Sequence, residues 1–274
     1  MAAESSVYSP YNAKNVPLTA GAIERILHEH GLPTYTVRNP VPFQRTMVHT
    51  SYVLRKDGYT TPSGQPATLA PCPSGVLDLQ MESYERHEFL GDSMLGASVS
   101  NYLWDRFPTA EPGFLTDLRK KIVNNKTLGT ICQEIGLDKY YVISRHVEDA
   151  CAGRGNLEKL GDVMEAFLAA VWEDCGRDFK IFHTFVSSLI EKHLKMTQLI
   201  LKNENYKDQF QKHCQKVLKF TPTYVQVTQE LNLFTMAVVD PTRREAVYGV
   251  GKASTKQQAE QNACKDALTR LNLL

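Results

Sequence analysis

The sequence predicts two parts, an all-α body followed by a small module with the order α-β-β-β-α. Apolar residues recur at helical spacing through most of residues 19–200, whereas residues 205–274 contain three stretches in which apolar and polar residues alternate. The composition is 42% hydrophobic and 22% charged, which is typical of globular domains. The boundary between the two parts is expected within residues 200–205.

The first 18 residues show no clear periodicity, and we expect them to form a flexible leader. The body that follows has six stretches in which apolar residues lie three and four positions apart, as on one face of a helix. These helical stretches are residues 20–32, 41–54, 85–107, 115–137, 156–176 and 178–194. Glycine and proline residues mark the turns between several of them.

Residues 56–80, with the sequence KDGYTTPSGQPATLAPCPSGVLDLQ, interrupt the helical body. They are rich in Pro, Gly, Thr and Ser and show little periodicity, so we expect a long surface insertion between two helices.

The last seventy residues change in character. A helical stretch covers residues 206–220, and three alternating stretches rich in β-branched and aromatic residues follow at 223–230, 233–240 and 244–253. The final helix is expected over 254–274, with Ser254 or Thr255 as its N-cap. We therefore expect a compact domain in residues 205–274.

The composition also excludes several classes of protein. No stretch approaches about 18 apolar residues, so no transmembrane span is expected, and the N-terminus lacks the pattern of a signal peptide. The six cysteines show neither CxxC pairs nor zinc-ligand spacing, which favours reduced thiols. We therefore expect an intracellular, cytoplasmic protein without membrane partners.

The net charge of +1 conceals an asymmetry between the two parts. Residues 205–274 carry ten Lys or Arg against six Asp or Glu, whereas residues 1–204 carry twenty-one against twenty-four. A basic module on a mildly acidic body suggests that the module holds a polyanion and that the body holds cations.

Two pairs of carboxylates lie where the helical pattern demands burial. Glu88 and Asp92 are four residues apart and Asp162 and Glu165 three apart, so each pair shares one helix face. Negative charges among apolar neighbours are costly unless they are compensated. A Mg²⁺ ion, which prefers oxygen ligands and binds through few carboxylates, would compensate both pairs.

The alternative is that these acids cap helices or pair at the surface with Arg86, Arg119 or Lys159. Both pairs lie in a matching Leu-Gly-Asp context, at residues 90–92 and 160–162, which favours a shared metal site. A glycine beside each aspartate would also let neighbouring helices approach closely.

Several segments together resemble one known family. ERHEFLGDSML (85–95) resembles the signature of ribonuclease III, the double-stranded-RNA endonucleases, and FQRTMVHTSYVL (43–54) and GDVMEAFLAAVWEDCG (161–176) resemble further family segments. GVGKASTKQQAEQNACKDAL (249–268) and the α-β-β-β-α order resemble a double-stranded-RNA-binding domain. The resemblance covers roughly residues 20–55 and 84–272.

The resemblance implies an all-α ribonuclease III catalytic domain over 19–200 and a double-stranded-RNA-binding domain over 205–274. Glu88, Asp162 and Glu165 match the metal-binding acids of the family, and Asp92 matches the acid that completes the site. All four are therefore expected to act in catalysis, through two Mg²⁺ ions per site for which Mn²⁺ can substitute. No small-molecule cofactor is expected.

Family members act as two-fold dimers in which each site cuts one RNA strand, leaving 5′-phosphate and 3′-hydroxyl ends. Glu85 and Phe89 match positions near the subunit contact, so the resemblance implies a homodimer that cleaves double-stranded RNA.

The C-terminal module departs from the family pattern. QELNLF (229–234) replaces the usual Gly-Pro-x-His loop, and Gln257 replaces the second of two lysines at the last helix. Each lost cation weakens phosphate binding, so we expect the module alone to bind duplex RNA weakly. Lys252, Thr255 and Lys256 are the expected RNA contacts.

Two other functions stay open. The protein could be a catalytically idle dimeric scaffold that holds structured RNA, or a protein that sequesters duplex RNA from other machinery. The four intact acids favour an active enzyme, whose role in RNA processing, defence or RNA silencing suppression the sequence does not specify.

Overall fold

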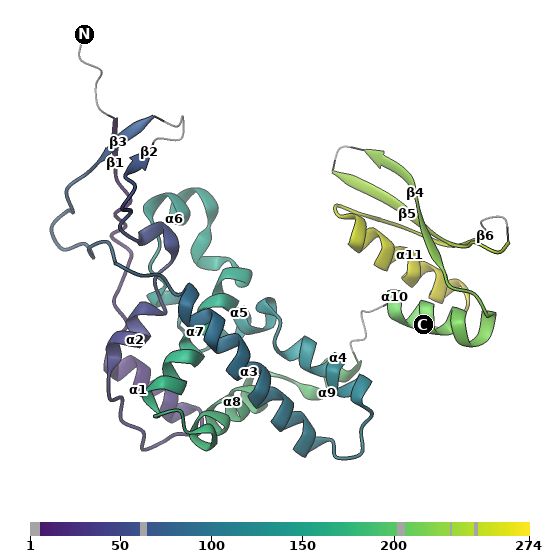
Figure 1. The fold of residues 1–274 in the computed structure, drawn as a ribbon, viewed down its shortest axis with the longest axis horizontal. Coiled ribbons are helices and arrows are strands. Elements are labelled where there is room, and N and C mark those ends of the chain that lie inside the picture. The colour runs from purple at the N-terminus through teal and green to yellow at the C-terminus, as the bar shows by residue number, and fades with distance from the viewer. Residues whose placement is uncertain (1–5, 61–64, 202–205, 231, 244–245) are drawn as a thin grey trace, which may run out of the picture. The chain divides into compact units, whose positions relative to one another are not determined.

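The structure is a computed structural model that describes residues 6–60, 65–201, 206–230, 232–243 and 246–274 of the 274-residue chain. The chain divides into two compact units, and the boundary along the sequence falls between Leu199 and Ile200 (Figure 1). Each unit has a hydrophobic core of its own. Among the described residues, no helix is both long enough and apolar enough to cross a membrane.

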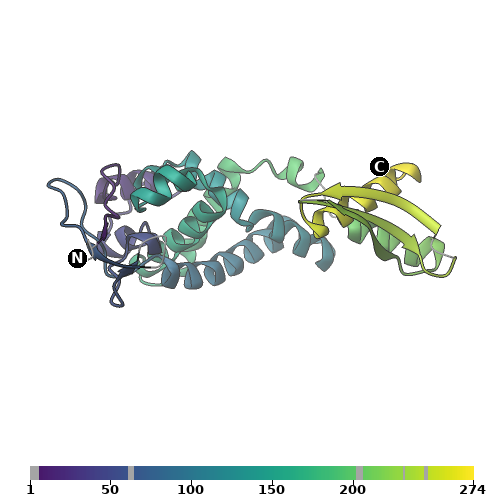
Figure 2. The same ribbon diagram turned by 90° about the horizontal axis from the view of Figure 1, so that it is seen from above.

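The first unit is mainly helical, as expected from the sequence. Its helices are α1 (Ala20–Glu29), α2 (Pro40–Arg45), α3 (Glu85–Arg106), α4 (Pro112–Ile122), α5 (Asn125–Glu134), α6 (Arg145–Cys151), α7 (Leu157–Asp174) and α8 (Phe179–His193), and α9 (Met196–Leu201) crosses the boundary. Three single 3₁₀ turns lie at Thr50–Tyr52, Asp138–Tyr140 and Gly153–Gly155. Figure 2 shows α3 as a long helix along one side of this unit.

The stretch at residues 115–137 was predicted as one helical segment but forms two helices. Asn124 is the N-cap of α5, and its side-chain oxygen accepts a hydrogen bond from the backbone N–H of Thr127 at 3.0 Å. An N-cap residue has extended backbone dihedral angles, so it ends one helical path and starts another.

α7 lies at the centre of the first unit, with α3 and α5 packed against it. Every residue from Leu160 to Val171 is buried. A helix that is covered on all sides needs apolar or small residues around its whole circumference, and most of this segment supplies them. Asp162 and Glu165 are the only charged residues within it.

A small three-stranded sheet lies at the edge of the first unit. β1 (Ser6–Tyr8) pairs in parallel with β3 (Pro66–Leu69), and β2 (Tyr59–Thr60) pairs with β3 in antiparallel orientation. The predicted insertion at 56–80 therefore contains two strands, although its residues 61–64 lie outside the described part. Strands of two to four residues are too short to produce a detectable period in the sequence.

The expectation of a flexible leader is wrong for residues 6–18. Besides β1, the side chains of Asn12 and Asn15 both donate hydrogen bonds to the carbonyl oxygen of Ile143, at 3.2 and 3.0 Å, and Leu18 is buried in the core. Buried amide groups require such partners, so this segment is bound to the helical body. Residues 1–5 lie outside the described residues.

The second unit has the expected α-β-β-β-α order. Its elements are α10 (Tyr206–His213), a π-helical turn at Cys214–Leu218, β4 (Thr223–Glu230), β5 (Leu233–Asp240), β6 (Ala246–Ala253) and α11 (Lys256–Arg270). The strands form an antiparallel sheet in the order β4-β5-β6, and Figure 1 shows both helices on the same side of it.

α11 packs very closely on β6 because two glycines face it. A Cβ atom at Gly249 would lie 2.3 Å from the carbonyl oxygen of Ala263, and one at Gly251 would lie 2.2 Å from the backbone nitrogen of Ala263. Phe210 from α10 and Val238 from β5 complete the core below this helix.

Candidate active site

The start of α3 places Glu88 against α7. The backbone N–H of Glu88 donates to the carbonyl oxygen of the buried Tyr84 at 3.0 Å. One turn further on, a Cβ atom at Gly91 would lie 1.8 Å from the carbonyl oxygen of Glu165. Only glycine permits α3 and α7 to approach this closely, and the approach brings Glu88 next to the acids of α7.

Three of the four predicted acids form one cluster. Glu88, Asp162 and Glu165 each offer a carboxylate oxygen, and these oxygens all lie within 4.8 Å of one another. Asp162 and Glu165 are buried and Glu88 is half-buried. Three carboxylates from two rigid helices make a donor set that suits a hard divalent cation such as Mg²⁺.

Asp92, the fourth predicted acid, lies outside this cluster and is exposed to solvent. It still acts on the cluster, because among neighbouring charges its carboxylate contributes most to raising the pKa of Glu165. Asp92 follows Glu88 by one turn of α3 and lies on the solvent-exposed side of the site.

The electrostatics of the cluster oppose its ionisation. Burial raises the pKa of Glu165 to about 8, and the charges of Asp92, Glu88 and Asp162 add to the effect. Burial also raises the pKa of Glu88, with the charge of Asp162 as the next cause. Both effects are those expected when carboxylates share a water-poor site, and a bound cation would reverse them.

Three side chains donate hydrogen bonds to Asp162. Asn125 Nδ2 lies 2.5 Å from Oδ1, and Lys159 Nζ and the Tyr84 hydroxyl lie 3.0 and 3.3 Å from Oδ2. The bond to Asp162 also raises the pKa of Lys159. These donors fix the orientation of the carboxylate.

One alternative from the sequence was that these acids pair with basic side chains such as Lys159. Asp162 does form such an ion pair with Lys159. Direct pairing is limited to Asp162, although the charge of Lys159 also acts to lower the pKa of Glu88 against the larger effects that raise it. Among the described residues, neither Glu88 nor Glu165 forms an ion pair or a side-chain hydrogen bond. Glu88 and Glu165 thus lack a direct cationic partner among the described residues, which favours a cation site over a purely structural role.

Asn125 was not found from the sequence, since it lies on α5, 37 residues before Asp162. Two glycines bring it into the site. A Cβ atom at Gly161 would lie 2.6 Å from Cα of Asn125, and one at Gly129 would lie 2.1 Å from the carbonyl oxygen of Leu157. Gly161 beside Asp162 was the only clue in the sequence that a second helix crosses there.

The two residues predicted near a subunit contact lie at the start of α3. Phe89 is 79% exposed, which is unusual for a phenylalanine. Glu85 is exposed as well, and the hydroxyl of Ser83 donates to it at 3.2 Å.

The three predicted RNA contacts lie together at the end of β6 and the start of α11. Thr255 is the N-cap of α11, and its hydroxyl oxygen accepts a hydrogen bond from the backbone N–H of Gln258 at 3.3 Å. Lys252 and Lys256 are exposed, and neither forms an ion pair with any residue in the described ranges. Unpaired lysines beside a helix N-terminus suit phosphate groups.

A carboxylate cluster between core helices, followed by a separate α-β-β-β-α module, is the combination typical of nucleases that act on double-stranded RNA. Comparison with known families agrees with this class. The Ribonuclease III domain matches residues 85–176, and the Double-stranded RNA binding motif matches residues 206–271. The chain belongs to the ribonuclease III family.

Similar proteins are found in viruses and bacteria. A protein of Paramecium bursaria Chlorella virus 1 is 35% identical over 68% of this chain and 66% of its own length. A ribonuclease 3 homologue of Acanthamoeba polyphaga mimivirus is 28% identical over 94% of this chain and 46% of its own length. Ribonuclease 3 of Staphylococcus aureus is 33% identical over 70% of this chain and 78% of its own length. The chain thus spans about two thirds of the first relative and about half of the second.

Proposed function

We propose that this protein is an endonuclease that cleaves double-stranded RNA by metal-dependent hydrolysis of phosphodiester bonds. The cluster of Glu88, Asp162 and Glu165 carries this proposal, because its negative charge is only partly compensated within the described chain. The family of the chain and its double-stranded RNA binding motif support RNA as the substrate.

The proposed cofactor is Mg²⁺, with two ions per site and with Mn²⁺ as a substitute. Glu88, Asp162 and Glu165 would hold the ions through carboxylate oxygens, and Asp92 would complete the site from the next turn of α3. When bound, Mg²⁺ supplies a water of lowered pKa as nucleophile and positive charge that stabilises the leaving oxygen. The products would carry 5′-phosphate and 3′-hydroxyl ends.

The other residues of the site orient and balance these ligands. Asn125 and Lys159 hold the two oxygens of Asp162 in place, so the carboxylate does not rotate when its surroundings change. Burial and the neighbouring acids raise the pKa of Glu165 to about 8, which favours its protonated form near neutral pH, and a cation held by the cluster would favour the ionised carboxylate. The ammonium of Lys159 lies 3.0 Å from Asp162 and would add positive charge beside a phosphate bound at the cluster.

The second unit would hold the duplex without reading its sequence. Lys252, Thr255 and Lys256 would contact phosphates at the start of α11. Two copies of the chain would pair through the face of α3 that carries Glu85 and Phe89, so that each copy cuts one strand.

The decisive experiment incubates the full chain with a long RNA duplex, with and without Mg²⁺. We expect short fragments only with Mg²⁺, and no cleavage of a DNA duplex of the same sequence. Glu165→Gln should keep duplex binding and lose cleavage by about 100-fold or more, because a neutral amide cannot compensate a cation.

The matched control is Glu158→Gln, which removes an exposed acid on the same helix and should cleave like the parent. A protein that binds the duplex tightly but cleaves it with neither Mg²⁺ nor Mn²⁺ would instead be the idle or sequestering protein that the sequence left open. Cleavage by Glu165→Gln within a few-fold of the parent would remove Glu165 from the mechanism.

A further inference from the structure

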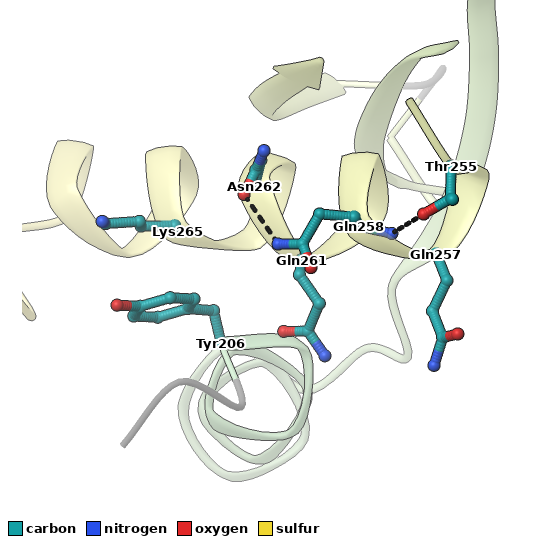
Figure 3. Close-up of a pocket in the computed structure, with 7 residues that line it drawn as sticks. All are labelled: Tyr206, Thr255, Gln257, Gln258, Gln261, Asn262 and Lys265. Atoms are coloured by element: carbon teal, nitrogen blue, oxygen red, sulfur yellow. Dashed lines mark hydrogen bonds between the residues drawn. The ribbon is translucent and has the colours of Figure 1, made fainter. Parts of the chain in front are cut away.

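Two histidines of the first unit face each other at the ends of helices. His30 follows the end of α1, and His193 is the last residue of α8. Their Nε2 atoms lie 3.0 Å apart, and a carboxylate oxygen of Glu134, the last residue of α5, lies 2.6 Å from Nδ1 of His193. Unlike the pocket beside Thr255 (Figure 3), which adjoins the proposed RNA contacts, this cluster has no part in the proposed function.

The partners of the Nδ1 atoms determine where the protons of the two rings lie. His30 Nδ1 is 2.7 Å from the carbonyl oxygen of Ile26, which can only accept, so this nitrogen carries a proton. The carboxylate of Glu134 is likewise an acceptor, so His193 Nδ1 carries a proton too. Two neutral rings would then have a lone pair on each Nε2, facing each other at 3.0 Å. This contact is favourable only with a cation between the two nitrogens.

The geometry of the two rings shows which cation fits. Their planes are inclined by 27° and their centroids lie 5.2 Å apart. Because this separation is nearly the distance between the Nε2 atoms plus the two ring radii, the nitrogens point straight at each other. A metal ion on this line would need a separation of about 4 Å, which is twice an ordinary zinc–nitrogen bond. The space therefore suits a proton.

Charged groups lie around the pair on all three helices. Glu29 of α1 and Glu134 of α5 contribute negative charge, and Lys192 of α8 contributes positive charge and donates to the carbonyl oxygen of Glu29. Burial lowers the pKa of His30, and the charges of His193 and Lys192 add to this effect. His30 is 4% exposed, so a second positive charge on the pair lacks the water that would stabilise it.

We propose that His30 and His193 share one proton and form a pH-sensitive latch, which joins α1, α5 and α8 near neutral pH and opens in mild acid. With three protons on the two rings, every contact from Ile26 to Glu134 is a hydrogen bond. A fourth proton places two N–H groups against each other at 3.0 Å and adds a second positive charge. The doubly charged pair therefore opposes the closed latch.

The latch lies at one end of a helix whose other end reaches the carboxylate cluster. α5 begins at Asn125, whose side chain donates to Asp162, and it ends at Glu134. Closure of the latch therefore fixes the end of α5 that the cluster does not hold.

Protonation of His30 determines how the latch depends on pH. The folded-state pKa of His30 lies below the ordinary value of 6.5, so the unfolded chain binds this proton first as the pH falls. The stabilisation by the latch is complete above about pH 6.5 and is lost as the pH falls below it. Glu165 changes the stability in the opposite direction over this range, so the latch is measured as a difference between variants.

The test combines an NMR titration of the histidines with melting curves of the full chain in EDTA between pH 5 and pH 8. His193→Gln removes the neighbouring charge, so His30 should take up its proton at a pH higher by about half a unit or more. The same variant should lower the Tm by about 3 °C at pH 7.5 and by less than about 1 °C at pH 5, where the second proton has opened the latch of the parent. Glu134→Gln, which keeps an acceptor but removes the negative charge, should also lower the Tm at pH 7.5.

The control is His146→Gln, which removes an exposed histidine of the same unit and should follow the parent at every pH. A Tm difference between the parent and His193→Gln that is constant with pH would overturn the latch, as would an unchanged titration of His30. If Zn²⁺ in place of EDTA raised the Tm of the parent but not that of His193→Gln, the pair would hold a metal ion instead of a proton.

The parent alone decides the question if His193→Gln fails to fold, because protonation of its His30 at pH 6.5 or above would contradict the shared proton. None of these measurements involves RNA. The outcome is therefore independent of the proposed function.

Discussion

At the scale of single residues, the main feature of the site is a carboxyl group, that of Glu165, buried among apolar side chains. Glu165 is 6% exposed and lies among the apolar residues of α7, so its ionised form is unfavourable until a cation compensates it. Spacing and context in the sequence were sufficient to select three acids that the structure brings together, whereas Asp92 lies outside that cluster. Asn125 was beyond sequence reasoning, since only the packing of α5 on α7 brings it to Asp162.

The raised pKa of Glu165 predicts how the stability of the metal-free protein depends on pH. The folded-state pKa of about 8 exceeds the ordinary value of 4.5, so the unfolded chain releases this proton first. The stabilisation from the protonated carboxyl is complete below about pH 4.5 and is lost as the pH rises to about 8. In Glu165→Gln this loss is absent, and we expect its Tm at pH 8 in EDTA to exceed that of the parent by about 2 °C or more.

The measurement is a series of melting curves in EDTA between pH 5 and pH 8. Glu158→Gln on the same helix is the control and should follow the parent. Mg²⁺ at pH 8 should raise the Tm of the parent more than that of Glu165→Gln. A parent whose advantage over Glu165→Gln grows with pH would contradict the assignment.

At the scale of elements, glycines determine how closely the helices of the site approach. α7 is contacted by α3 at Gly91 and by α5 at Gly129 and Gly161, and at each position a Cβ atom would collide with backbone. The sequence indicated close approach through its two Leu-Gly-Asp segments. The sequence did not reveal that Gly91 faces α7 whereas Gly161 faces α5. The spacing of apolar residues within one helix does not identify the helix that packs against it.

Substitution of two glycines on α3 separates close packing from helix propensity. Gly91→Ala places a Cβ atom 1.8 Å from the carbonyl oxygen of Glu165, whereas a Cβ atom at Gly96 meets nothing within 4 Å. We expect Gly91→Ala to destabilise the fold by about 2 kcal/mol and to lose most cleavage, because the acids of α3 and α7 move apart. Gly96→Ala should stabilise the fold by about 0.5–1 kcal/mol.

Urea unfolding and the cleavage assay together check this prediction. Equal stability and activity of the two variants would show that the close approach of α3 and α7 is unimportant for the site. The sequence could not supply this distinction, since both residues are glycines in one continuous helix.

The outer elements were the least predictable from the sequence. β1, β2 and β3 combine a segment near the N-terminus with the insertion at 56–80. Each strand is held mainly by pairing with the others and by contacts such as the stacking of Tyr8 on Tyr59, with ring centroids 5.0 Å apart. Such pairing between distant segments leaves no local pattern, whereas the strands of the second unit are eight residues long and rich in β-branched and aromatic residues.

At the scale of the whole molecule, the two separate cores predict that cleavage by the first unit and RNA binding by the second can be separated. The core of the first unit contains no residue of the second, and the core around Phe210, Val238 and Leu268 contains none of the first. Each unit therefore has the buried apolar surface that independent folding requires.

Deleting residues 205–274 should leave a folded helical protein that cuts duplex RNA at low salt and fails at physiological salt. The carboxylate cluster stays intact in this variant, but the lysines at the start of α11 are lost, and with them the proposed phosphate contacts, whose contribution screening weakens. Circular dichroism and cleavage at several salt concentrations test this. A truncated protein that is unfolded, or inactive at every salt concentration, would contradict the division of labour.

The last prediction concerns the exposed face of α3. Phe89 is 79% exposed next to the carboxylate cluster, and a partner copy that buried it would gain roughly 2–3 kcal/mol per side chain. In a two-fold interface the gain occurs twice, so Phe89→Ala should raise the dissociation constant of the dimer about thousandfold and convert double-strand cuts into nicks.

Trp104→Ala removes an aromatic residue that is 69% exposed on the same helix, about 22 Å from Phe89 along the axis, and should leave a contact centred on Phe89 intact. Sedimentation of the parent comes first, because a monomer at micromolar concentration that makes clean double-strand cuts would rule out the dimer altogether.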